Sequence, residues 1–296
     1  MHITLLTTLA MLAFAGNSLL CRMALGGTDP IDPTSYTAVR LFSGAVVLAL
    51  LVVVGRTRAE RRAHGSWRSA AWLFLYAIAC AYAYLSLDTG VGALILFGAV
   101  QATMIGAGLR SGERPRPPQW LGMAVAAAGL VYLLWPGISA PSWEGALLMT
   151  GAGVAWGLYS LHGRGAEDPL ASTAANFLRA LPLAALLLVI MFDRRQLTPI
   201  GLLLAVLSGA VTSGVGYAIW YAAVRRLTAS AAAVVQLSAP VLATYAGVAW
   251  LDEALTLRIV LSSIAILGGI ALVVRQGTTS EQAPAFASAR SDGQGP

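Results

Sequence analysis

The chain has 296 residues, of which 57% are hydrophobic and only 11% are charged, and its mean hydropathy is +0.73. Soluble globular proteins carry about 25% charged residues, so this composition excludes an ordinary soluble enzyme. The formal net charge of +6 comes from 19 arginines and no lysine. Most of these arginines lie in short loops between apolar segments, where arginines orient helices, so we do not expect nucleic-acid binding.

Ten apolar segments follow one another along the chain, and each is close to the length of about 20 residues that a helix needs to cross a bilayer. Proline and glycine mark most of the joints, and Asp88-Thr89-Gly90 predicts a tight turn between the third and fourth segments. We therefore predict an all-α integral membrane protein with ten transmembrane helices. The expected spans are 3–24, 33–54, 67–87, 89–109, 118–135, 143–162, 171–192, 199–221, 229–251 and 255–275.

The distribution of arginine predicts the orientation of these helices. If the N-terminus is cytoplasmic, the segments on that side hold 13 arginines and those on the other side hold four. Arginine accumulates in cytoplasmic loops, so we expect both termini to be cytoplasmic and the protein to be a multi-pass protein of the bacterial cytoplasmic (inner) membrane. Residues 277–296 are polar and small, which is typical of a disordered cytoplasmic tail.

The chain also contains a weak internal repeat. Residues 87–134 align without a gap with residues 227–274, and six of the 48 aligned positions are identical. We infer two five-helix repeats, at 1–137 and 138–276, and because five is odd the second repeat is inverted in the membrane relative to the first. Inverted repeats are typical of transporters, whose substrate site lies near the middle of the membrane between the repeats.

Glu113 and Glu253 occupy equivalent positions of this alignment, each where one span ends and the next begins. A carboxylate at such a position stabilises the N-terminus of a helix. We expect each glutamate to cap the helix that follows it.

Several short motifs occur in a fixed order along residues 3–275, namely Phe14–Arg22, Gly112-Glu113-Arg114, Gln119–Gly122, Tyr221–Ser230, Pro240 and Leu251-Asp252-Glu253. In this order and spacing they resemble the EamA-type drug/metabolite transporters, and within them the YddG-type amino-acid exporters. The resemblance implies a fold of ten helices in two repeats and the export of small metabolites.

Motifs of catalysis and of nucleotide binding are missing. The sequence has no His-Glu-x-x-His motif and no phosphate-binding loop with Gly-Lys, so we expect no enzymatic activity, cofactor, metal or ATP. The expected partners are a small-molecule substrate and the lipid bilayer, and we expect a monomer.

The acidic residues bear on energy coupling. Carboxylates that bind or relay ions usually lie within a span, whereas every Asp and Glu here lies in a loop, a tail or a span end. This favours a facilitator driven by the substrate gradient. The alternative is coupling through Asp88, Glu144 or His162.

Polar and aromatic side chains within the spans are the candidates for the substrate site. An amide in hydrocarbon needs hydrogen-bond partners, and an aromatic ring with a polar group suits an amphipathic organic substrate. The alternative is that these side chains are interhelical contacts and ordinary packing. The candidates are Asn17, Tyr82, Gln101, Trp156, Tyr159, Tyr217, Gln236 and Ser238.

Two arginines and two prolines within spans complete the prediction. Arg40 and Arg179 are candidate contacts for a substrate carboxylate; alternatively, each extends to the membrane surface or binds helix carbonyls. Pro182 and Pro240 interrupt the backbone hydrogen bonds of their spans, which makes them candidate hinges or static kinks.

Together these observations predict a transporter that exports small organic metabolites by alternating access through a central cavity between the repeats. Amino acids are the expected substrates, either aromatic ones or a broad set. The alternative is a multidrug or other metabolite exporter with proton coupling.

Overall fold

A computed structural model of the protein describes residues 3–55, 65–110, 116–135, 140–163, 166–224 and 235–276. The tail predicted at 277–296, the Glu113 cap and the first residues of the predicted ninth span lie outside the described residues.

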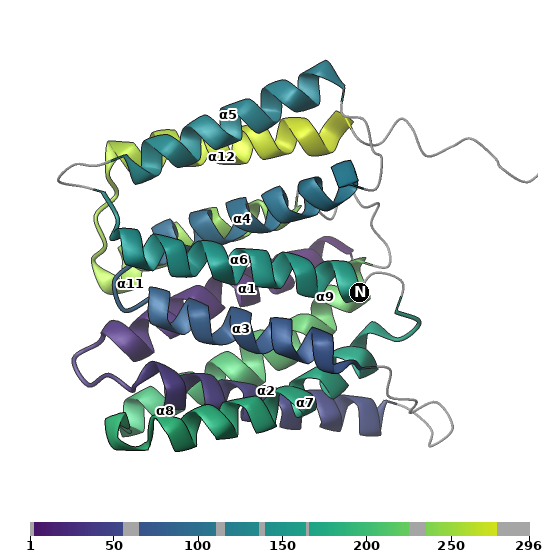
Figure 1. Ribbon diagram of the computed structural model, residues 1–296, viewed down its shortest axis with the longest axis vertical. Coiled ribbons are helices and arrows are strands. Elements are labelled where there is room, and N and C mark those ends of the chain that lie inside the picture. Colours follow the sequence, from purple (N-terminus) through teal and green to yellow (C-terminus); the bar gives the residue numbers. More distant parts are fainter. Residues whose placement is uncertain are drawn as a thin grey trace, which may run out of the picture.

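Every regular element in the described ranges is a helix, as predicted for an all-α protein. The helices run side by side, with α5 and α12 at one end of the long axis and α2, α7 and α8 at the other (Figure 1). A π-helical segment, η3, joins α8 and α9 into one continuous span, Pro199–Ala223. The bounds are α1 Ile3–Gly26, α2 Pro33–Val54, α3 Trp67–Ala83, α4 Thr89–Arg110, α5 Pro117–Leu134, α6 Trp143–Gly163, α7 Pro169–Ile190, η2 Phe192–Arg194, α8 Pro199–Leu207, η3 Ser208–Val215, α9 Gly216–Val224, α11 Ser238–Leu251 and α12 Leu257–Gln276.

Side-chain caps followed by proline begin three of these helices. The Asp32 carboxylate accepts a hydrogen bond from the Ser35 backbone N–H at 2.9 Å before α2. Asp168 before α7 and Thr198 before α8 do the same, at 3.1 Å each. Proline follows each cap, where its missing N–H costs nothing and its fixed φ suits the first helical turn. These caps fix where the three helices begin.

A tight connection is present near Asp88, as predicted, but it spans residues 84–88, and Thr89 and Gly90 belong to α4. Helix α3 ends at Ala83 and α4 begins at Thr89, so a short connection reverses the chain between them. The Leu87 backbone N–H donates to the Ala83 carbonyl at 3.1 Å, and the Gly92 N–H donates to the Asp88 carbonyl at 2.9 Å. Two antiparallel helices therefore replace a single long hydrophobic segment.

Length and hydropathy identify the helices that can cross a membrane. Within the described ranges, α1, α2, α4, α5, α7 and the α8–α9 span are long and apolar enough, and α11 and α12 contain shorter apolar helices. Helices α3 and α6 do not meet the same criteria of length and hydropathy, and these two helices pack against each other. The less apolar pair therefore lies together, and it contributes several of the aromatic side chains described below.

Contacts between the two halves follow a reciprocal pattern. Corresponding helices pair directly: α2 with α7, α4 with α11, and α5 with α12. Other contacts occur twice, because α3 packs on α6 as α1 packs on α8, and α4 packs on α6 as α1 packs on α11. These contacts are unchanged when the halves are exchanged, which is the pattern expected of two repeats related by a two-fold axis.

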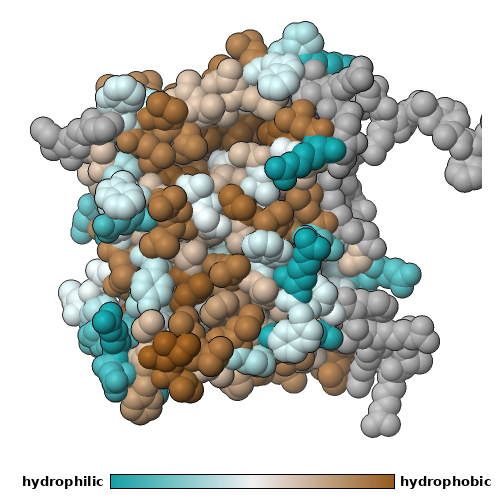
Figure 2. Space-filling view, viewed as in Figure 1, coloured by the Kyte–Doolittle hydropathy of each residue, from teal (hydrophilic) through white to brown (hydrophobic). Residues whose placement is uncertain are grey.

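The outer surface is apolar over much of its area (Figure 2). Large hydrophobic side chains such as Leu147, Val189 and Ile264 are about two-thirds exposed on the outside of the bundle. Exposure of such a surface to water is unfavourable, whereas contact with lipid chains is not.

Candidate functional site

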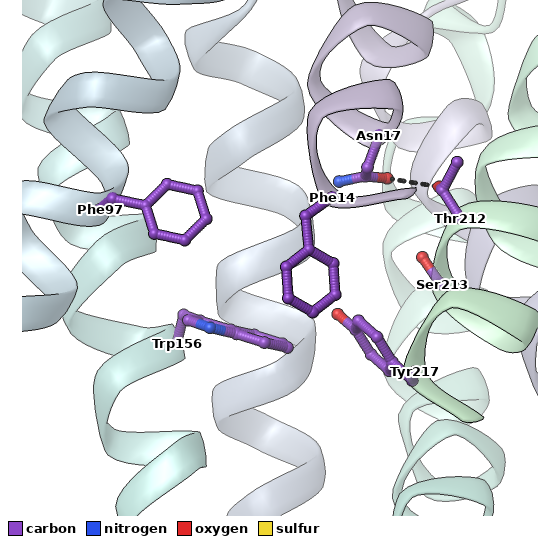
Figure 3. A pocket seen from close by; sticks show the side chains of 7 residues that line it. All are labelled: Phe14, Asn17, Phe97, Trp156, Thr212, Ser213 and Tyr217. Carbon is purple, nitrogen blue, oxygen red and sulfur yellow. Dashed lines mark hydrogen bonds between the residues drawn. The ribbon is translucent and has the colours of Figure 1, made fainter. Parts of the chain in front are cut away.

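A small cavity lies inside the bundle between α1, α4, α6 and the η3–α9 segment (Figure 3). Its volume is about 30 Å³, which is enough for about one water molecule but far too small for an organic metabolite. The cavity would therefore have to widen before a metabolite could occupy it. The lining residues are Phe14, Asn17, Phe97, Trp156, Thr212, Ser213 and Tyr217.

Trp156 is the centre of an aromatic cluster at this cavity. Its ring centroid lies 4.8 Å from that of Tyr76, 5.4 Å from that of Tyr159 and 5.5 Å from that of Tyr217. Phe14 adds an edge-to-face contact to Tyr217 at 6.0 Å. These rings come from α1, α3, α6 and α9, so they join both halves of the chain. They offer flat apolar walls together with tyrosine hydroxyl groups.

The Asn17 amide organises the polar side of the same cavity. Its Oδ1 accepts hydrogen bonds from Ser208 Oγ at 2.8 Å and from Thr212 Oγ1 at 3.2 Å. Its Nδ2 donates to the Tyr76 hydroxyl at 3.4 Å, and the Tyr36 hydroxyl donates to Ser208 Oγ at 2.8 Å. A buried amide is stable only with such partners, and these connect α1, α2 and α3 with η3.

The π-helical segment η3 supplies three hydroxyl groups to the cavity region, from Ser208, Thr212 and Ser213. π-Helical turns are rare and often occur at functional sites. The segment also approaches α2 closely, because a Cβ atom on Gly209 would collide with the Arg40 carbonyl and the Ser43 side chain. Glycine at 209 therefore allows η3 to lie directly against α2.

Arg40 is a buried cation behind this polar wall, with 2% of its surface exposed. Its Nη2 donates to the Tyr76 hydroxyl at 3.2 Å, and its Nε donates to Ser213 Oγ at 3.4 Å. The guanidinium carbon also lies 5.3 Å from the centroid of the Tyr76 ring. The remaining nitrogen, Nη1, is buried without a hydrogen-bond partner among the described residues.

The structure brings several of the predicted site residues together. Asn17, Trp156 and Tyr217 line the cavity. Tyr159 packs against Trp156 and donates a hydrogen bond to Thr173 Oγ1 at 3.5 Å. Arg40 reaches the same region through Tyr76 and Ser213. Gln101 is buried on α4 one helical turn after Phe97, on the same face of that helix, but it is not among the residues that line the cavity.

Other predicted residues lie outside the cavity lining. Tyr82 is near the end of α3, where its hydroxyl is 3.3 Å from Thr34 Oγ1. Arg179 donates from Nη1 to the Ala175 carbonyl of its own helix at 3.1 Å. This contact matches the alternative prediction, in which Arg179 binds helix carbonyls and not a substrate. The exposed Ser238 hydroxyl donates to the Val235 carbonyl at 2.7 Å.

Gln236 and the two prolines also lie away from the cavity lining. Gln236 is half-buried and lies two residues before the start of α11. Pro182 is within α7, and Pro240 is the third residue of α11. Their role as hinges stays a prediction.

Tyr36, Tyr76 and Ser208 complete the polar network and were not among the residues predicted from the sequence. A usable signal was present within single helices: Tyr36 precedes Arg40 by four residues, and Ser208 precedes Thr212 by four. Residues at that spacing share one helix face. No comparable signal links α3 to α1, so the contact between Tyr76 and Asn17 follows from helix packing alone.

The expectation for Glu253 is corrected by the structure. Its carboxylate accepts from the Thr89 backbone N–H at 2.8 and 2.9 Å and from Thr89 Oγ1 at 2.8 Å. It therefore caps α4 in the other half of the chain, not the following helix α12. Asp252, at φ 52°, turns the chain so that this carboxylate meets the free N–H groups at the start of α4. Arg22 lies 3.8 Å from the same carboxylate.

Comparisons with known proteins agree with this architecture. The sequence profile described as "EamA-like transporter family" matches residues 143–275. An uncharacterized protein of Pseudomonas aeruginosa is 56% identical over 270 residues, which cover 91% of this chain and 93% of that protein. A crystal structure described only as that of a protein superimposes with a TM-score of 0.66, covering 93% of this chain and 98% of the other. At 22% identity, that likeness shows a shared fold.

Proposed function

We propose that this chain exports amino acids through the cavity at Trp156. The chain belongs to the EamA-like transporter family and is a multi-pass membrane transporter of small metabolites rather than an enzyme. The observation that carries the proposal is the lining of that cavity. Aromatic rings lie on one side and the Asn17 amide and the η3 hydroxyl groups on the other. Such a site accommodates a solute with one apolar and one polar end.

We propose that transport occurs by alternating access. A space of about 30 Å³ does not hold a metabolite, so the helices around it must move apart to admit one, and in the proposed mechanism they open to one membrane face and then to the other. The reciprocal contacts between the halves support this mechanism, because exchanging the two sets of contacts would exchange the open face. Pro182 in α7 and Pro240 at the start of α11 are the proposed hinges.

We propose that the substrate gradient alone drives transport. The Asp and Glu residues that the structure describes lie at helix ends or in connections, and none lines the cavity. A proton-coupled site in a membrane normally contains a titrating carboxylate or histidine.

The proposal is tested with purified protein in liposomes and a panel of labelled amino acids. Trp156→Ala should lower the uptake of aromatic substrates by about tenfold, which corresponds to the loss of roughly 1.4 kcal/mol of binding. Trp120→Ala is the matched control, because Trp120 is 55% exposed on the outer surface. The diagnostic result is a changed substrate profile. Equal losses for all substrates that follow lower thermal stability would show that Trp156 is a packing residue.

A further inference from the structure

The buried charge of Arg40 has no anionic partner in the part of the chain that the structure describes. The ion pairs found there join Arg22 to Asp88 and to Glu253. The ionisable side chains that interact with Arg40 are Tyr36, Tyr76, Tyr217, Cys80 and Cys21, and tyrosine and cysteine are ordinarily neutral at pH 7. The dipoles of these side chains solvate the guanidinium in part, but they carry no negative charge that would neutralise it.

An unneutralised guanidinium inside a membrane is costly, and such residues normally pair or face a substrate pathway. Arg40 is the eighth residue of α2, which places its Cα about 10 Å along the helix axis from the N-terminal end of α2. It lies one hydrogen bond from the cavity lining through Ser213, and two through Tyr76 and Asn17. The charge is therefore directly behind the proposed substrate position.

The geometry of its donors matches one chemical group. A guanidinium presents planar N–H pairs that bind both oxygens of a carboxylate. Nη1 is already unpartnered, and the contacts of Nη2 and Nε at 3.2 and 3.4 Å are long for charged donors. Once the surrounding side chains move aside, a carboxylate would give the buried Nη1 a partner and replace the Tyr76 or Ser213 hydroxyl at a second nitrogen.

A substrate amino group would find no comparable partner. None of the seven side chains lining the cavity is acidic, so an ammonium group would find no counter-charge there, only neutral acceptors such as the Asn17 amide oxygen and ring contacts with Trp156 or Tyr217. It would also be repelled by Arg40 in the same low-dielectric region.

We propose that the site selects organic carboxylates with an apolar or aromatic body: Arg40 binds the carboxylate, the aromatic cluster binds the body, and an amino group is not required. This inference rests on the proposed function, in that it concerns the same cavity. It extends the substrate class from amino acids to the corresponding acids without the amino group.

Three relatives of phenylalanine test this inference as competitors of labelled phenylalanine uptake into liposomes. 3-Phenylpropionate lacks the amino group, phenylalaninamide lacks the carboxylate charge, and 2-phenylethylamine lacks the carboxylate entirely. 3-Phenylpropionate should compete about as well as phenylalanine, and the two cations should be weaker by about 10- to 100-fold, as expected for the loss of a charged hydrogen-bonded pair. If the cations compete as well as 3-phenylpropionate, the inference is wrong even though phenylalanine is transported.

Arg40→Gln and Arg40→Lys then test the residue itself. Arg40→Gln should abolish the preference for acids over amides, and Arg40→Lys should keep part of it because the charge remains. The ratio of acid to amide competition is the readout, since a purely structural loss would lower both alike. Arg195→Gln is the control, because Arg195 is an exposed residue in the connection between α7 and α8.

A failure of the proposed function would be recognised separately. If the wild-type protein moves no amino acid, thermal unfolding of the purified protein is measured with 3-phenylpropionate and with 2-phenylethylamine. Stabilisation by the acid alone, lost in Arg40→Gln, would support the carboxylate site. No stabilisation by the acid in the wild-type protein would refute it.

Discussion

Removing the Glu253 carboxylate should destabilise the protein, because this side chain joins the two halves at one end of the bundle. It accepts from the Thr89 backbone N–H and hydroxyl at 2.8 Å, and its side chain is only 9% exposed. Hydrogen bonds to a charged group contribute about 1.5–3 kcal/mol each, and a charge at a helix N-terminus adds about 0.3–1 kcal/mol. Because such terms are not additive, we expect Glu253→Ala to lower the free energy of unfolding by about 3 kcal/mol.

Two further substitutions separate the contributions of the hydrogen bonds and of the charge to this expected loss of stability. Glu253→Gln keeps an acceptor oxygen but loses the charge, so we expect a loss of about 1–1.5 kcal/mol. The ion pair between Arg22 and Glu253 has a 3.8 Å separation and an arginine that is 23% exposed, and such a pair contributes about 0.5 kcal/mol. Arg22→Gln also removes the Asp88 pair and the hydrogen bond from Arg22 Nη1 to the Tyr84 carbonyl at 2.8 Å, so its coupling with Glu253→Gln, and not its total effect, measures the ion pair. The capping bonds, and not the ion pair, should therefore carry most of the stability.

The assay is unfolding of the purified protein in mixed micelles at increasing SDS mole fraction. A double-mutant cycle between Glu253→Gln and Thr89→Val should give a coupling energy of about 1 kcal/mol. Glu144→Gln is the control, since Glu144 is an exposed residue in the first turn of α6, and it should change stability by less than about 0.5 kcal/mol. A loss for Glu253→Ala no larger than that of Glu144→Gln would refute the reasoning.

Three other predictions concern packing, orientation and energy coupling. A Cβ at Gly153 would lie 2.6 Å from α4 atoms, so Gly153→Ala should lower the free energy of unfolding by about 1–3 kcal/mol, whereas Gly151→Ala, where nothing lies within 4 Å, should not lower it. Reporter fusions at Arg58 and Glu167 should read as cytoplasmic and a fusion at Gly137 as external; an external signal at Arg58 would contradict both the orientation and the inverted repeat. Uptake into liposomes down a substrate gradient should persist when the proton gradient is collapsed, and a strict requirement for that gradient would establish proton coupling instead.

Much of the fold could be predicted from local sequence features. The length of each apolar segment fixes a membrane helix, because a backbone inside lipid must satisfy its own hydrogen bonds. Proline after a capping residue fixes where α2, α7 and α8 begin. These effects act within one helix or one turn, so the sequence by itself determined the element order and most of the helix bounds.

The candidate site could be predicted only in part. Asn17, Arg40 and Trp156 stand out because polar or amphipathic groups are unusual at their depth in a span. The same criterion also selected Tyr82, Arg179 and Ser238, whose hydrogen bonds lie outside the cavity lining. Polarity and depth do not report which side of a helix faces the bundle interior.

Only the tertiary structure decided which side chains meet. Tyr36 bonds to Ser208, 172 positions along the chain, and Glu253 caps Thr89, 164 positions away. Such pairs depend on the rotation and the relative height of each helix, which are set by packing against several neighbours at once. No local pattern contains that information, so the polar network around Arg40 and the link between the halves became visible only when the helices were assembled.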